Sequence, residues 1–187
     1  MNTLVRQNFN DIRSEFKQER YEAFMYLINK AKQPVDWVYE VWNDVLTLTK
    51  TGDNHQRTLA VQLLAALAKS DIQNRLVRDY YNVIAVTHDE CFTTARHSLK
   101  ALWKIGVANL HLKGLVVREL TNRFLSCKNE KNCKLIRYDI IEVLRKMYDT
   151  LHDDAIEDTV ELLIETEEEP KCKQKYLKLW SDVSKRK

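Results

Sequence analysis

The sequence predicts an all-α protein built as an array of antiparallel helix pairs. Its 187 residues include only three Gly and two Pro, which favours helices joined by short connections over strands joined by tight turns. The stretch AVQLLAALAK at 60–69 also returns in weaker form as ARHSLKALWK at 95–104 and RYDIIEVLRK at 137–146. Repetition with a period of about 20 to 50 residues is typical of stacked helical or supersecondary units.

The chain is expected to open with a helix or a helix pair. The first apolar positions recur at helical spacing and are Val5, Phe9, Ile12 and Phe16. After a polar break, a second apolar stripe begins at Tyr21, and Pro34 ends the segment. Residues 1–33 are therefore predicted to form an N-terminal helical cap.

Helix-pair repeats are predicted for the rest of a single domain over 1–187. Their expected boundaries are 34–71, 72–110, 111–154 and 155–183. The predicted helices are 35–49 and one containing 60–69, then 72–86 and 89–105, then 112–126 and 133–148, then 155–165 and one around Trp180. The sequence Thr51, Gly52, Asp53 supplies a turn and a helix cap inside the first pair, and Thr87, His88, Asp89 occupy the equivalent place in the second.

The second helix of each repeat carries a buried stripe. Ala60, Leu64 and Leu67 follow the i, i+4, i+7 pattern of a helix face that packs in a core. The equivalent residues of the later copies are Ala95, Leu99 and Leu102, then Ile141 and Leu144. The aromatic residues expected to pack between helices are Trp37, Trp42, Tyr80 and Tyr81.

The repeat consists of a helix, a turn with Asp, and a second helix with small and branched apolar residues near a basic residue. This arrangement resembles the HEAT-like and armadillo-type helical repeats. The resemblance covers about Val35 to Trp180. It implies an α-solenoid, a curved right-handed superhelical array of helix pairs, with the second helices on the concave side. It implies no particular activity.

Charge is sorted by helix. The four second-helix stretches contain fourteen Lys or Arg and only two acids, Asp139 and Glu142. A net charge of +3 can therefore conceal a basic face and an acidic face. The predicted basic groove consists of Arg57, Lys69, Arg96, Lys100, Lys104, Lys134, Arg137, Arg145, Lys146 and Lys175, with Trp103 as an aromatic contact.

Two interpretations of these cations stay open. They could form a groove for an acidic protein segment or for DNA or RNA, with Trp103 stacking on a base or holding a peptide cation. They could instead solvate each exposed helix face and pair with acidic neighbours, with Trp103 half-buried between repeats. Weighing both, we predict a non-enzymatic binding module or scaffold.

The alternative is an enzyme. Among helical-repeat proteins, the alkylpurine DNA glycosylases offer a precedent for a basic concave face with a carboxylate near aromatic residues. Asp139 beside Tyr138 is the candidate here. The Gly- and Pro-bearing entry motif of that family and its tandem Trp followed by Asp are both missing. The sequence also lacks a phosphate-cradling glycine loop and a Ser, His, Asp set.

No metal, small-molecule cofactor or membrane partner is expected. His88, Cys91 and His97 lie close in sequence, but no fourth ligand is placed nearby. Cysteines 91, 127, 133 and 172 show neither a paired framework nor CxxC spacing, so reduced thiols are predicted. No apolar run reaches the ~20 residues of a membrane span, and residues 1–9 do not read as a signal peptide. A cytoplasmic location follows as an expectation.

Overall fold

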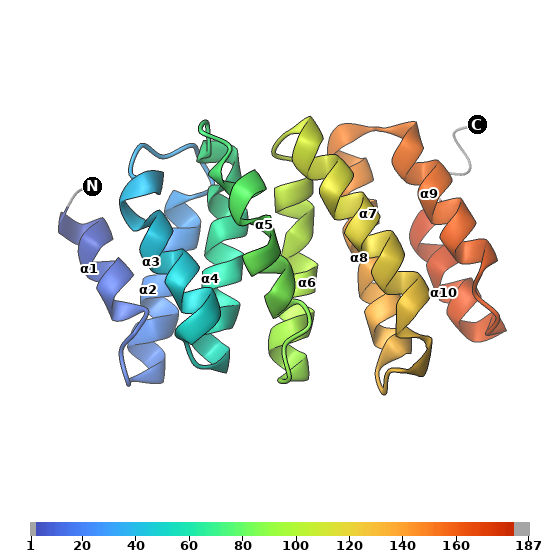
Figure 1. The fold of residues 1–187 in the computed structure, drawn as a ribbon, viewed down its shortest axis with the longest axis horizontal. Helices are drawn as coiled ribbons and strands as arrows, with labels where there is room; N and C mark the ends of the chain where they lie inside the picture. The colour runs from blue at the N-terminus through green and yellow to red at the C-terminus, as the bar shows by residue number, and fades with distance from the viewer. Residues whose placement is uncertain (1–2, 182–187) are drawn as a thin grey trace. The chain divides into compact units, whose positions relative to one another are not determined.

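The computed structural model describes residues 3–181, which are helical apart from the connecting loops (Figure 1). The α-helices are α1 (Thr3–Asp11), α2 (Lys17–Lys30), α3 (Val38–Thr51), α4 (Asn54–Leu67), α5 (Arg75–Val86), α6 (Phe92–Gly106), α7 (Leu110–Ser126), α8 (Cys133–Leu151), α9 (Asp154–Glu165) and α10 (Pro170–Trp180). Two short 3-10 helices follow α4 and α7, namely η1 (Ala68–Ser70) and η2 (Cys127–Asn129). The all-α array of antiparallel helix pairs predicted from the sequence is confirmed.

The chain divides into two compact units, unit 1 up to Lys104 and unit 2 from Ile105. In unit 1, α3 packs against α4 and α5, and α2 packs against α4. In unit 2, α8 packs against α7, α9 and α10, and α7 packs against α9. Within each unit, the first helices of successive pairs thus contact one another, as α3 and α5 or α7 and α9 do. The second helices do the same, as α2 and α4 or α8 and α10 show. The single domain and its repeat boundaries stay predictions, and residues 182–183 of the last predicted repeat lie outside the described residues.

The apolar stripes of the second helices form the core, as predicted. The residues that the structure buries include Ala60, Leu64, Leu67, Ala95, Leu99, Leu102, Ile141 and Leu144. Trp37, Trp42 and Tyr80 are buried as well. The prediction was wrong for Tyr81, whose side chain is 71% exposed because the next position on α5 turns away from the face that carries Tyr80.

The start of α4 is fixed by the predicted cap. The Asp53 carboxylate accepts a hydrogen bond from the Gln56 N–H at 2.8 Å, and the Gln56 side chain accepts one from the Asp53 N–H at 3.1 Å. This reciprocal pair is a capping box, which satisfies two donors that a helix start leaves without partners.

The first helix of the next pair begins later than predicted, at Arg75 instead of residue 72. The Asp71 carboxylate accepts from the N–H groups of Arg75 at 3.0 Å and Leu76 at 2.7 Å, so it caps the helix there. Asn74 has a φ of 53°, a left-handed conformation that interrupts a helix. Ile72 consequently lies exposed in the turn.

In four contacts, a side chain on one helix pairs with a carboxylate in the loop that precedes a later helix. We call these contacts clasps. Each clasp pairs a donor on an earlier helix with a carboxylate 30 to 40 positions further on. The four clasps are Tyr39 to Asp71 at 3.0 Å, Arg57 to Asp89 at 2.5 and 2.9 Å, Lys113 to Asp153, and Arg137 to Glu167 at 3.1 Å.

Each clasp carboxylate also accepts a backbone N–H near the start of the helix that follows it. Asp89 accepts from Cys91 at 2.9 Å, before α6. Asp153 accepts from Ala155 at 3.1 Å and caps α9, and Glu167 accepts from Glu169 at 3.0 Å, just before α10. One carboxylate therefore fixes where a helix starts and ties that helix to an earlier one.

Three of the clasp carboxylates, Asp89, Asp153 and Glu167, are held in their charged form, because the pKa of each is lowered. The Arg57 guanidinium lowers the pKa of Asp89 by more than burial raises it. The Lys113 ammonium lowers the pKa of Asp153 in the same way. Burial raises the pKa of Glu167, but the Glu169 N–H, Arg137 and Tyr176 together outweigh it, and the net pKa is lowered.

We predict that Asp89→Asn lowers the free energy of unfolding by about 2 kcal/mol at neutral pH, between the ~1 kcal/mol of an exposed pair and the ~3–5 kcal/mol of a fully buried one. The side chains of Arg57 and Asp89 are 26% and 6% exposed. The folded-state pKa of Asp89 lies below the ordinary value of 3.8, so its contribution is present above that pH and disappears as pH falls through the lowered pKa.

Urea unfolding at neutral pH and near pH ~3 measures this difference. The control is Asp36→Asn, an exposed carboxyl in the same unit, which should change stability by less than about 0.5 kcal/mol. A difference for Asp89→Asn that is as small as the control, or that grows in acid, would contradict the clasp.

Candidate functional site

A depression in unit 1 gathers three of the predicted groove cations. It has a volume of about 410 Å³. Its lining consists of Gln62 from α4 and of Phe92, Thr93, Arg96, His97, Lys100, Ala101, Trp103 and Lys104 from α6. No Asp or Glu is among these lining residues.

The sequence of α6 places these side chains by helical geometry. Ala95, Leu99 and Leu102 are buried in the core. The three cations Arg96, Lys100 and Lys104 recur every fourth residue and therefore form a row along the helix. This row lies beside the buried face, because Arg96 follows Ala95 and Lys100 follows Leu99. Four residues of an α-helix rise ~6 Å, which sets the spacing along this row.

Trp103 lies at the end of the cationic row and is half-buried. The Lys104 ammonium lies 5.9 Å from the centroid of its ring, a cation–π contact. Arg96, Lys100 and Lys104 each also interact with other groups of the chain, so they are not loose surface side chains. The structure therefore brings Arg96, Lys100, Lys104 and Trp103 together, as the sequence suggested.

Arg57 and Lys69, the cations predicted on α4 and its extension, have contacts that hold unit 1 together. Arg57 forms the clasp with Asp89 and also donates to the Gly52 carbonyl at 2.7 Å. Lys69 is exposed, but its ammonium donates to the Lys32 carbonyl at 2.9 Å. Neither lines the depression on α6.

Most of the predicted cations of unit 2 are in ion pairs. Lys146 pairs with Glu142 at 2.9 Å on the same helix. Arg145 pairs with Asp149, donates to the Leu179 carbonyl at 2.5 Å, and lies 5.7 Å from the ring centroid of Trp180. Lys175 is exposed on α10. The groove assigned from the sequence stays a prediction for these residues.

A second depression, of about 590 Å³, lies in unit 2 beside the acidic run Glu167–Glu169. Each of the three glutamates pairs with one cation. The pairs are Arg137 with Glu167 at 3.1 Å, Lys128 with Glu168 at 3.2 Å, and Lys134 with Glu169 at 2.5 Å. Hydrogen bonding to Glu169 raises the pKa of Lys134. Sequence reasoning found Lys134 and Arg137, but it did not pair them with these glutamates.

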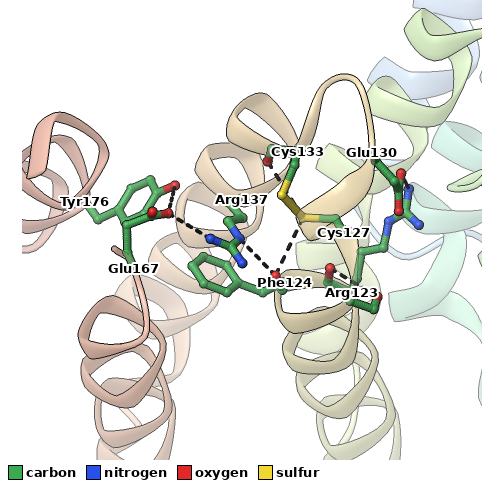
Figure 2. Close-up of a disulfide and its surroundings, with 9 residues drawn as sticks. Arg123, Phe124, Cys127, Glu130, Cys133, Arg137, Glu167 and Tyr176 are labelled. Atoms are coloured by element: carbon green, nitrogen blue, oxygen red, sulfur yellow. Dashed lines mark hydrogen bonds and ion pairs between the residues drawn. A yellow bond between two sulfur atoms is a disulfide. The ribbon is translucent and has the colours of Figure 1, made fainter. Parts of the chain in front are cut away.

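A disulfide joins Cys127 and Cys133 next to this depression (Figure 2). The prediction of reduced thiols was wrong for this pair, because the 3-10 turn η2 brings their Cα atoms to 5.3 Å, within the usual range of a disulfide. Cys91 and Cys172 are free thiols.

Figure 2 shows Arg137 between the disulfide and Glu167. Its guanidinium donates to the Phe124 carbonyl at 3.0 Å, lies 4.7 Å from the Phe124 ring centroid, and pairs with Glu167. Tyr176 donates to the same carboxylate at 3.2 Å. Arg137 is therefore a structural residue that links α7, α8 and α10.

The free thiol of Cys91 lies just before α6. Its sulfur accepts hydrogen bonds from the Thr94 N–H and from the Asn54 side chain, and these lower the pKa of Cys91 to about 7. The backbone carbonyl of Asn54 also accepts a hydrogen bond from the Thr94 hydroxyl at 3.0 Å. These contacts tie the start of α6 to α4.

The other candidate groups are placed as follows. Asp139, the candidate residue of the glycosylase alternative, is fully buried, with 0% exposure. Within residues 3–181, no group of three or more His, Cys, Asp and Glu is arranged to hold a metal ion. In the same range, every helix is too short or too polar to cross a membrane.

No family model matches the chain, and no curated protein matches it. Solved structures do. A chain of the CpcE and CpcF complex of phycocyanin lyase from Nostoc sp. PCC7120 is similar, with 14% identity, a TM-score of 0.62, and coverage of 94% of this chain and 96% of that one. A designed armadillo repeat protein in complex with the peptide (KR)4 is also similar, with 12% identity, a TM-score of 0.53, and coverage of 95% and 80%.

At these identities the likeness concerns the fold alone. It extends over nearly the whole of this chain and of the phycocyanin lyase chain. The resemblance to HEAT-like and armadillo-type helical repeats, expected from the repeated second helices, is confirmed at the level of fold class.

We predict that Cys133→Ser lowers the free energy of unfolding by about 2 kcal/mol, the chain-entropy contribution of a disulfide that closes so short a loop. Cys133 is half-buried, so the serine hydroxyl can reach solvent and the buried Cys127 thiol stays in place. Urea unfolding with and without dithiothreitol measures the effect.

Dithiothreitol should lower the stability of the wild type to that of Cys133→Ser and leave the variant unchanged. Cys91→Ser, which removes a half-buried thiol outside the disulfide, serves as the control. Insensitivity of the wild type to dithiothreitol would show that the disulfide does not stabilise the fold.

Proposed function

We propose that the protein is a non-enzymatic binding module in which the α6 depression of unit 1 holds an acidic segment of a partner protein. The observation that carries this proposal is the composition of the depression. Three cations, a half-buried tryptophan and no carboxylate line the same hollow. Such a lining favours an anionic group with an apolar neighbour.

The spacing of the cations supports an extended acidic segment. Arg96, Lys100 and Lys104 follow one another in steps of ~6 Å along α6. In an extended chain, side chains on one side recur every two residues, or ~6.6 Å. Acidic residues at alternate positions of a partner therefore match the row closely enough to pair with each cation in turn.

The chain itself contains such an arrangement in unit 2. The run Glu167–Glu169, which connects α9 and α10, lies against Lys128, Lys134 and Arg137, with one cation for each carboxylate. Cations on and just before a second helix thus bind a short acidic segment within the same molecule. By analogy, the α6 row is suited to an acidic segment supplied by another protein.

A protein partner is favoured over nucleic acid. Several cations that the sequence assigned to a continuous groove take part in clasps and ion pairs, among them Arg57 and Arg137. Binding to a nucleic acid usually depends on many neutralised phosphates. The two similar structures are a protein complex and a peptide complex, which supports a protein partner in kind but not in identity.

The glycosylase alternative has little support, because Asp139 is fully buried and the α6 depression has no carboxylate in its lining. A base-releasing enzyme needs such a group beside the extruded base. Function without a cofactor and a cytoplasmic location stay predictions.

We predict that a peptide with glutamates at alternate positions binds the protein, and that the double substitution Lys100→Glu, Lys104→Glu weakens binding at least about tenfold, or ~1.4 kcal/mol. Isothermal titration calorimetry measures the affinity, which should also fall as salt rises because dissolved ions screen charges that solvent can reach. Unfolding curves verify that the variant is folded.

The matched control is Lys17→Glu, Lys50→Glu, which makes the same charge change at exposed positions of unit 1 outside the depression. Equal weakening in both variants would reduce the effect to net charge and contradict the site. Tighter binding of a single-stranded oligonucleotide than of the peptide, lost in the same variant, would favour the nucleic-acid alternative.

A further inference from the structure

We propose that the α6 depression recognises a phosphorylated side chain within the acidic segment. This inference rests on the proposed function and specifies its ligand. A phosphoserine or phosphothreonine group carries a charge of about −1.5 to −2 at neutral pH and three acceptor oxygens, whereas a carboxylate carries one charge and two oxygens.

The donors around the depression match that group in number and type. The Arg96 guanidinium carries a planar fork of N–H donors, and the Lys100 ammonium, one helical turn further on, adds a second cationic donor group. Side chains at i and i+4 lie ~6 Å apart at their Cβ atoms, so both can reach one phosphoryl group. Thr93 and His97 line the same hollow and supply a hydroxyl and an imidazole. Thr93 lies about one turn before Arg96, and His97 lies next to Arg96 and about one turn before Lys100.

The depressions described above in unit 1 and in unit 2 differ in the way that matters for this choice. In unit 2, each cation meets one glutamate from consecutive positions, and the acidic side chains are themselves part of the lining. In unit 1, three cations share a hollow whose lining contains no acid. One group with two charges and three acceptors meets several convergent donors better than a single carboxylate does.

The size and rim of the depression fit a single modified side chain. At about 410 Å³, it is near the lower end of the ~300–1,000 Å³ found for small-ligand sites, so it takes a side chain and not a folded element. Phe92 lies one helical turn before Arg96 and can cover the apolar part of the phosphorylated residue, whereas Trp103 lies beside Lys104 at the other end of the lining. The remaining acidic residues of the partner would then follow the row toward Lys104.

The test compares three peptides that differ only at the central position of the acidic segment, which is serine, glutamate or phosphoserine. We expect the phosphoserine peptide to bind about tenfold more tightly than the glutamate peptide, and the serine peptide to bind most weakly. Arg96→Gln should abolish the preference for phosphoserine while the glutamate peptide still binds. Arg96→Lys, which keeps the charge but not the planar fork, should restore only part of the preference.

Inorganic phosphate should displace the phosphoserine peptide more strongly than chloride at the same ionic strength. Lys17→Gln is the charge-matched control outside the depression and should leave the preference unchanged. If the glutamate peptide binds as tightly as the phosphoserine peptide, or if phosphate and chloride compete equally, this inference is overturned and the proposed function stands. If none of the peptides binds to folded protein, the proposed function itself is contradicted.

Discussion

The fold depends on carboxylates that serve two partners at once. A helix pair cannot bury its apolar stripe alone, so each pair must be fixed against the next. In both units, a carboxylate in a loop accepts a backbone N–H near the start of the following helix and a side-chain donor from an earlier one, as Asp89 does with Cys91 and Arg57. Helix boundaries and the stacking of neighbouring helices are therefore set by the same groups.

Several of the cations found in the sequence have structural contacts. Arg57 and Arg137 belong to clasps, and Arg145 lies against Trp180. The α6 row, in contrast, lines a hollow without acidic residues. Part of the sorting of charge by helix thus has a physical cause in the assembly of the array, and recognition at α6 is our proposal for the cations of that helix.

The fold could be predicted from the sequence because it depends on local periodicity. The stripe of Ala60, Leu64 and Leu67 and its later copies predicted the buried helix faces, and the Asp53 turn predicted a cap. The clasp partners of Arg57 and Arg137 could not be predicted, because they lie 30 or more positions away and depend on how the helices stack. The disulfide of Cys127 and Cys133 was missed for a similar reason, since only the course of the turn η2 brings the two residues together.

The most direct test of recognition at α6 is a titration of the acidic phosphoserine peptide followed through the four tryptophan indole N–H signals by NMR. Trp37, Trp42 and Trp180 are buried, whereas Trp103 lines the depression. The account predicts that the Trp103 indole signal shifts in a saturable way while the signals of the buried tryptophans stay in place. Saturable binding that leaves Trp103 unchanged, or that shifts Trp180 instead, would contradict it.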